Sequence, residues 1–137
     1  MMNLLRLAAM RDDARLRELA QRTIAALGPQ ARQSVGAAEC FLSGVEFALV
    51  GPVEIAIVGS PQDARTQELV RAVRGTYLPN HVLMLLNPDH PERSPKSPLL
   101  EGRTLVDGKP AAYVCRDYAC RRPVATPQEL RDQLNGR

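Results

Sequence analysis

The hydrophobic positions change their spacing near the middle of the chain. From the N-terminus to about residue 50, apolar residues recur at intervals of three and four, which places them on one face of an α-helix. Beyond Gly51 and Pro52, short apolar runs rich in β-branched residues indicate strands, and an amphipathic stretch between two of them indicates a helix. The pattern predicts a mixed α/β fold, with a helical segment over residues 1–50 and a small three-stranded β-α-β-β-α module over residues 51–137.

Two helices are predicted at the start of the chain. The first ends near Met10. The second begins after Asp12 or Asp13, either of which can accept hydrogen bonds from the free N–H groups of a helix start. It is expected to end at Gly28 and Pro29, because glycine favours the end of a helix and proline does not continue one.

A third helix is predicted over roughly residues 31–49, and it is apolar around most of its circumference. Its charged residues lie seven apart on one narrow line, at Arg32, Glu39 and Glu46. Such a helix must be covered on several sides, and one neighbouring helix is too little. We therefore expect it to be covered by the rest of this chain, by the remainder of a longer parent protein, or by self-association. Cys40 is expected to lie in the core.

A strand–helix–strand unit follows. Residues 53–58 and 81–86 are apolar on both faces, which is typical of buried parallel strands. The helix between them is predicted to begin with Ser60 as its N-cap and Pro61 as its first helical residue. Two parallel strands joined in this way form a right-handed βαβ unit.

The last third of the chain contributes one more strand and one more helix. Residues 87–110 hold five of the eleven prolines, which predicts a long irregular connection. Residues 111–115 are the third predicted strand, and the long connection allows it to run antiparallel. Thr126 and Glu129 form a capping box at the start of a short final helix. We expect the strand 53–58 at the centre of the sheet, since it is apolar on both faces.

Composition excludes several classes of protein. Hydrophobic residues make up 45% and charged residues 24% of the 137 residues, as in ordinary globular domains. No apolar run is long enough to span a membrane and the start of the chain lacks a signal-peptide pattern, so we expect a cytoplasmic protein with no membrane partner. The net charge is +3, without a dense basic stripe or aromatic platforms, so a nucleic-acid partner is not expected.

Cys115 and Cys120 are the first candidates for chemistry. Their C-x4-C spacing differs from the redox motif C-x-x-C, and residues five apart on a continuous strand face opposite sides. A turn at residues 116–118 would bring the sulfurs together, and three nearby arginines would favour the thiolate form. Three alternatives stay open: two structural thiols, a reversible disulfide, or a metal site that lacks two further ligands.

Gly59 and Ser60 form the second candidate, an anion-binding turn. The turn follows a buried strand and opens a helix, and helix N-termini attract anions. However, the chain has neither a G-x-G-x-x-G motif nor a P-loop, and Asp63 would repel a phosphate, so a simple capped turn is the alternative. His81 and His90 show no paired ligand spacing, and we expect no metal and no cofactor.

Two stretches resemble a known family. The motif A-Y-V-C-x-x-x-x-C over residues 112–120, with Pro123 after it, and P-V-E-I-A-I-V-G over residues 52–59 are similar to the C-terminal end of the spermatogenesis-associated, thioredoxin-domain-containing proteins. The helices that follow Asn3 resemble what precedes that end. The resemblance covers nearly the whole chain.

The resemblance implies a larger parent protein. Members of the family carry a thioredoxin-like domain, then an α/α toroid, then a C-terminal α/β module. Residues 1–50 would then be the end of the toroid. This chain has neither the thioredoxin C-x-x-C nor most of the toroid, so no active-site residue of the family carries over, and the Cys115/Cys120 pair is left without an assigned role.

Three functions are compatible with these observations. The first is a structural or regulatory C-terminal segment of such a protein, without catalysis of its own, whose partner is the rest of the parent chain. The second is a thiol redox module in which Cys115 and Cys120 cycle. The third is an α/β module that binds an anionic small molecule at Ser60 and the connection 87–110.

Overall fold

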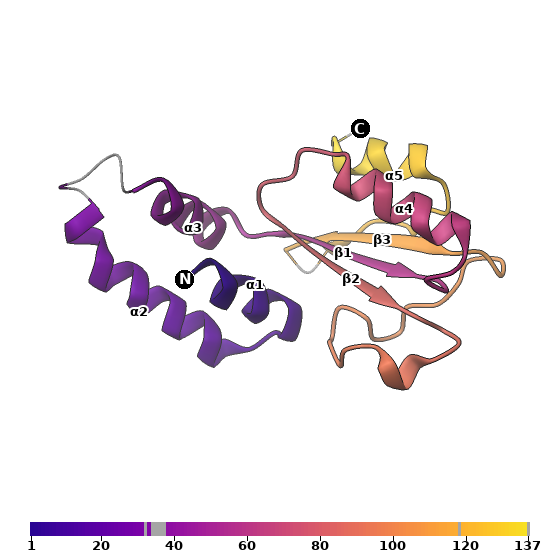
Figure 1. The fold of residues 1–137 in the computed structure, drawn as a ribbon, viewed down its shortest axis with the longest axis horizontal. Coiled ribbons are helices and arrows are strands. Elements are labelled where there is room, and N and C mark those ends of the chain that lie inside the picture. The colour runs from indigo at the N-terminus through magenta and orange to yellow at the C-terminus, as the bar shows by residue number, and fades with distance from the viewer. Residues whose placement is uncertain (32, 34–37, 118, 137) are drawn as a thin grey trace.

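The computed structural model describes residues 1–31, 33, 38–117 and 119–136. In this part of the chain, three helices precede a β-sheet, and two further helices pack against the sheet (Figure 1). The helices are α1 (Met2–Arg11), α2 (Ala14–Ala31), α3 (Glu39–Val50), α4 (Ala64–Arg74) and α5 (Pro127–Leu134). A short 3-10 helix, η2 (Pro91–Arg93), lies in the long connection that follows the second strand. The predicted mixed α/β fold is therefore confirmed.

The sheet has the strand order β2-β1-β3-β4. Its strands are β1 (Val53–Val58), β2 (His81–Leu86), β3 (Ala111–Arg116) and β4 (Ala119–Cys120). β1 pairs with β2 in parallel and with β3 antiparallel, so the central position predicted for β1 is confirmed. The two-residue strand β4, which pairs with β3, was not among the three predicted strands.

Helices α4 and α5 cover one face of the sheet (Figure 1). Because alternate side chains of a strand point to opposite faces, Ile55 and Ile57 of β1 face these helices together with Val114 of β3. The helices contribute side chains at helical spacing, such as Leu130 and Leu134 of α5. Burying each large aliphatic side chain stabilises the fold by about 1.5–3 kcal/mol, so this layer is a main source of stability.

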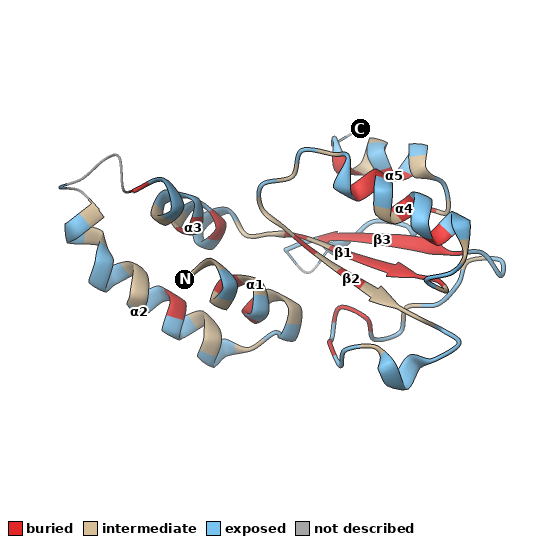
Figure 2. Ribbon diagram, viewed as in Figure 1, coloured by how far each residue is buried: buried red, intermediate tan, exposed pale blue. Residues whose placement is uncertain are grey.

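The opposite face of the sheet is covered by α1 and by the connection between β2 and β3. Ala56 of β1 and Tyr113 of β3 face this side, and Leu5 of α1 and Leu99 of the connection belong to the same buried cluster. The buried Ser97 Oγ donates a hydrogen bond to the Met10 carbonyl, which attaches the connection to the end of α1. Figure 2 shows β1 and β3 as almost entirely buried between the two layers.

The three N-terminal helices bury much less. In α2 the structure buries Ala20 alone, and in α3 only Gly44 and Phe47. Large apolar side chains on α3 stay exposed, with Leu42 at 56% and Leu49 at 81%. Figure 2 shows α2 and α3 mainly in the colours of exposed and half-buried residues.

Three expectations about these helices are wrong. Helix α2 continues through Gly28 and Pro29 to Ala31. Pro29 lies in the last turn, so the backbone hydrogen bond that it removes and any kink that it causes affect only the end of the helix. The third helix begins at Glu39 rather than near residue 31, and the predicted residues 32 and 34–37 lie outside the described part of the chain. Cys40 is exposed rather than buried. It shares the side of α3 that carries Gly44 and Phe47, but it lies in the first turn of the helix, before the buried residues begin.

None of the helices in the described ranges is both long and apolar enough to cross a membrane.

Gly59 is required by close packing at the end of β1. A Cβ atom at this position would lie 2.2 Å from Thr66 Oγ1 and 2.9 Å from Pro110 Cβ, both far too close. We expect Gly59→Ala to lower the free energy of unfolding by about 1–3 kcal/mol, the usual cost of overpacking. Urea denaturation followed by circular dichroism measures this change.

Gly28→Ala is the matched control, because no atom lies within 4 Å of a Cβ at that helical position. It should leave stability unchanged or raise it by up to about 1 kcal/mol. Equal effects of the two substitutions would contradict the packing role of Gly59.

Candidate functional site

The structure brings Cys115 and Cys120 together as a disulfide. Cys115 lies on β3 and Cys120 on β4, directly opposite each other in the antiparallel register, with 4.0 Å between their Cα atoms. The chain reverses between them at Asp117, which adopts a left-handed conformation. Of the three alternatives for this pair, the bonded arrangement is the one the geometry presents. The cysteines differ in exposure, since Cys115 is 2% exposed whereas Cys120 lies on the exposed edge strand.

Arg103 lies beside both sulfurs. Its Nη2 is 3.1 Å from Cys120 Sγ and 3.6 Å from Cys115 Sγ. The guanidinium carbon stands 4.9 Å from the centre of the Tyr113 ring, and Nε donates to the Leu99 carbonyl. The Tyr113 hydroxyl in turn donates to the Thr104 carbonyl, so the segment that carries Arg103 is fastened to β3.

A hollow of about 190 Å³ lies over the disulfide and is lined by charged residues. Arg103, Arg17 of α2, Glu54 of β1 and Asp12 after α1 contribute to its wall, and Arg17 is paired with Asp12 at 3.1 Å. Glu54 is the register partner of Cys115 in the β1–β3 pair. The site is therefore assembled from α2, the sheet and two connections.

The Glu54 carboxyl is perturbed by its surroundings. Burial raises its pKa above the ordinary value, and the carboxylates of Asp12 and Asp117 raise the pKa further, while Arg17 lowers it. A half-buried carboxylate with two acidic neighbours is unfavourable for folding when it is ionised.

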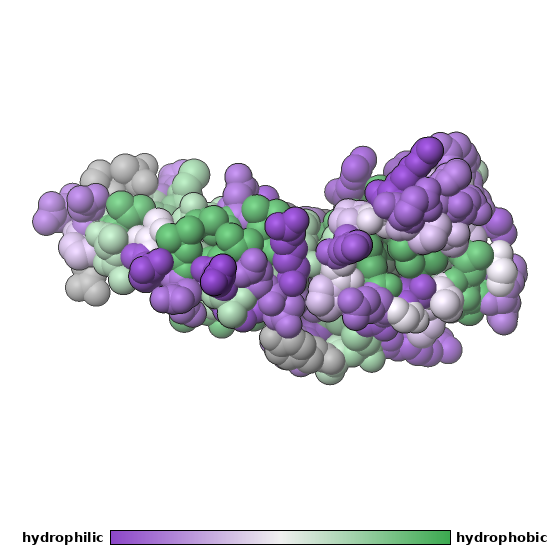
Figure 3. Space-filling model, turned by 90° about the horizontal axis from the view of Figure 1, so that it is seen from below, coloured by the Kyte–Doolittle hydropathy of each residue, from purple (hydrophilic) through white to green (hydrophobic). Residues whose placement is uncertain are grey.

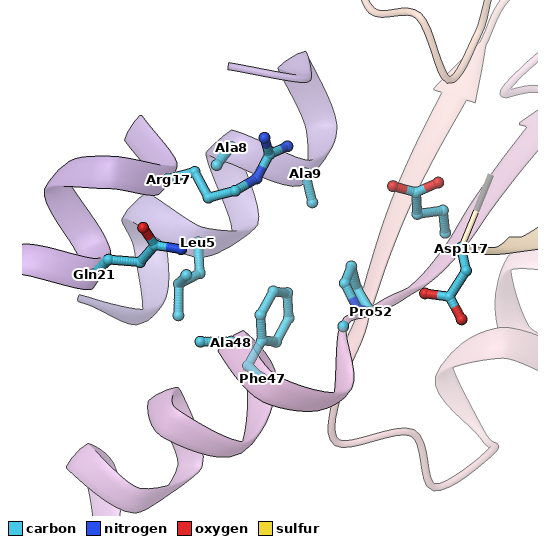
Figure 4. Close-up of a pocket in the computed structure, with 11 residues that line it drawn as sticks. Leu5, Ala8, Ala9, Arg17, Gln21, Phe47, Ala48, Pro52 and Asp117 are labelled. Carbon is cyan, nitrogen blue, oxygen red and sulfur yellow. The ribbon is translucent and has the colours of Figure 1, made fainter. Parts of the chain in front are cut away.

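A second hollow of about 180 Å³ adjoins the first at the junction of helices and sheet (Figure 4). Figure 4 shows Leu5 and Phe47 between the helices and Pro52 and Asp117 on the side of the sheet. Its helical wall is mostly apolar, with Arg17 at its rim.

The predicted anion-binding turn has a different local structure. Ser60 is not the N-cap of α4, because a turn closed by the Asp63 N–H on the Ser60 carbonyl intervenes and the helix begins at Ala64. Asp63 is the N-cap and accepts the Arg65 N–H at 2.8 Å, so a negative charge already occupies the helix start. Arg65 also pairs with Asp63, which lowers the pKa of that carboxyl. Gly59 and Ser60 are therefore parts of a tight, capped turn.

Metal ligands do not converge in the described parts of the chain, where no group of three His, Cys, Asp or Glu residues could hold an ion. His81 Nδ1 lies 2.6 Å from the Leu78 carbonyl. His90 lies 3.4 Å from Glu92 in the connection after β2.

Arg103 and Glu54 were not identified from the sequence as residues of this site. Arg103 comes before Cys115 in the chain at the end of a proline-rich stretch, where no local pattern marks it. The one usable signal for Glu54 was that it interrupts an otherwise apolar strand.

Comparison with known proteins finds three similar mammalian proteins. Over 83 residues, or 60% of this chain, it is 36% identical to spermatogenesis-associated protein 20 of Homo sapiens and 34% identical to the proteins of the same name of Rattus norvegicus and Mus musculus. The matched part is 10–11% of the length of those proteins. The resemblance to the spermatogenesis-associated, thioredoxin-domain-containing family is thus confirmed over these 83 residues, which is less than the nearly complete coverage expected. No protein-family model and no solved structure matches the chain.

Glu54→Gln should stabilise the chain at neutral pH. Because the pKa of Glu54 is higher in the folded than in the unfolded state, its contribution to stability is full below the unfolded value of about 4.3 and is lost as the pH rises through the folded pKa. The uncharged glutamine avoids this loss. We expect a higher Tm than wild type at pH 7 and no advantage at acidic pH, measured by thermal denaturation across that range.

Glu68→Gln removes an exposed carboxylate from α4 and serves as the control. Its Tm should follow that of the wild type at every pH. A Glu54→Gln chain that is less stable than wild type at neutral pH would show that the ionised carboxylate is favourable there.

Proposed function

We propose that this chain is a structural segment of a larger protein, in which its N-terminal helices pack against further apolar helices and the α/β module closes one end. The observation that carries the proposal is the uncovered apolar side of α3. The matched relatives are about ten times longer than the part they share with this chain, which supports a larger parent.

Helix α3 has two apolar sides, and the described part of the chain buries residues on only one of them. Successive helical residues are rotated by about 100°, so Leu42, Val45 and Leu49 share one side, roughly opposite to the buried Gly44 and Phe47. The buried side meets α1, with which α3 is in contact. The other side carries the exposed Leu42 and Leu49.

The neighbouring helices also carry exposed apolar side chains. Leu7 of α1 is 44% exposed, and Leu19 and Leu27 of α2 are each 42% exposed. Figure 3 shows apolar side chains gathered over the helical part of the molecule. Covering a fully exposed leucine is worth about 1.5–3 kcal/mol, so this set of side chains supplies a strong drive to pack against other helices.

The expected occupant is a set of apolar helices rather than a charged partner. The exposed side of α3 offers almost no charge, since Glu39 and Glu46 are the charged residues of this helix. A segment of this kind fits a helical array in which each helix is covered by neighbours on both sides. This arrangement is what the family resemblance implies for residues 1–50.

The isolated chain should bind the dye ANS and self-associate in a concentration-dependent way. In the double variant Leu42→Glu/Leu49→Glu both properties should fall strongly, with the helix content unchanged, because the substitutions lie on the uncovered side of α3. Dye fluorescence, sedimentation velocity and circular dichroism measure the three properties.

Ser43→Glu is the control, since it adds a charge at an exposed polar position of the same helix. It should leave dye binding and association close to wild type. A monodisperse monomer without dye binding would contradict the proposal. So would a dimer of fixed stoichiometry that no longer binds the dye, because a second copy would then be the occupant.

A further inference from the structure

We infer that the Cys115–Cys120 disulfide is a thiol-exchange site. A dithiol opens the disulfide by attack on Cys120, and Arg103 stabilises the thiolates that form. This inference is independent of the packing proposed for α3, because it rests on the sulfurs and the groups around them. Nothing in the similarity to other proteins assigns a role to this pair.

Accessibility selects the sulfur that is attacked. Cys120 lies on the exposed two-residue edge strand, whereas Cys115 is 2% exposed on β3. The hollow of about 190 Å³ that both cysteines line gives an approach to the bond. An incoming thiolate therefore reaches Cys120 Sγ, and Cys115 is the leaving group.

Arg103 stabilises the products of this reaction. Its Nη2 is within 3.6 Å of both sulfurs, so a thiolate on either cysteine would form a charge-assisted contact without movement of the backbone. The contacts of Arg103 with the Leu99 carbonyl and the Tyr113 ring hold the guanidinium in place. A cation beside a cysteine favours thiolate, and a thiol of low pKa leaves more readily in exchange.

The exchange balances with a dithiol as the reductant. One of its sulfurs, as the thiolate, attacks Cys120 Sγ; a mixed disulfide forms, the S–S bond breaks, and its electron pair leaves on Cys115. The second thiol of the reductant loses its proton and attacks the first sulfur of the reductant, which releases Cys120 as a thiolate. The dithiol is oxidised to a disulfide, the protein disulfide is reduced by two electrons, and the two protons go to the released thiolates or to solvent.

The hairpin does not depend on the disulfide for its geometry. The Arg121 N–H donates to the Val114 carbonyl, and Ala112 and Val124 exchange two backbone hydrogen bonds. A bond between residues only five apart also restricts the unfolded chain less than one that closes a long loop. Reduction can therefore proceed with the fold retained.

Several charges face the pair besides Arg103. Arg17 of α2, Asp12 after α1 and Glu54 of β1 line the same hollow, and Asp117 lies in the hairpin turn. Arg17 is engaged by Asp12. Among the contacts of the described residues, Arg103 is the cation within 3.6 Å of both sulfurs, and its removal isolates its effect from that of the three carboxylates.

The test uses the full chain with Cys40→Ser, which removes the exposed free thiol. Dithiothreitol should open the bond reversibly with an unchanged circular dichroism spectrum. The pH midpoint of alkylation of the reduced chain should rise by about one unit or more in Arg103→Gln, since an adjacent opposite charge shifts a pKa by about 1–3 units. At a pH above both midpoints, the equilibrium with dithiothreitol should shift about tenfold toward the disulfide. Arg103→Lys keeps the charge, so its alkylation midpoint and its equilibrium with dithiothreitol should lie between those of the parent chain and those of Arg103→Gln.

Arg116→Gln removes an exposed cation of the same hairpin and should behave like the parent chain. In single-thiol chains, Cys115→Ser should form a mixed disulfide with Ellman's reagent about tenfold faster than Cys120→Ser, because only the former keeps the exposed sulfur. The inference is overturned if reduction unfolds the chain, if Arg103→Gln titrates like the parent, or if the two single-thiol chains react equally fast.

Discussion

Strand β1 is the element on which the rest of the molecule depends. It is hydrogen-bonded on both edges, by β2 and by β3, and it is covered on both faces by separate buried clusters. Its register also positions the candidate site, because it places Glu54 opposite Cys115. A slip of one residue would exchange the two faces of the strand and move Glu54 into the layer under α4 and α5.

Much of the sheet could be predicted because the relevant signals are local. The run 53–58 is apolar at nearly every position. Thr126 is the N-cap of α5 in the structure as in the sequence, although Glu129 Oε2 accepts the Thr126 hydroxyl rather than its backbone N–H. The start of α4 could not be predicted in this way. Ser60 and Asp63 are both good N-cap residues, and the local sequence offers no reason to prefer the second, which the structure uses.

The site could be predicted only in part, for a related reason. The cysteines could be identified by residue type, but their pairing depends on a reversal of the chain at Asp117. The sequence did not determine this reversal, so three alternatives for the pair stayed open. Arg103 reaches the sulfurs because the long connection returns across the sheet and is attached to Tyr113. Such contacts arise from tertiary structure, and no spacing in the sequence encodes them.

The packing of helix α1 determines which parts of the molecule become exposed together in local unfolding. The hydrophobic period changes at Gly51, yet Leu5 of α1 shares a buried cluster with Ala56 and Tyr113 of the sheet. The boundary of the packed core therefore does not coincide with Gly51, where the spacing of the hydrophobic residues changes. Fluctuations that detach α1 would expose to water both the sheet face that α1 covers and the hollow above the cysteines. Local unfolding there is therefore one cooperative event that spans both halves of the chain.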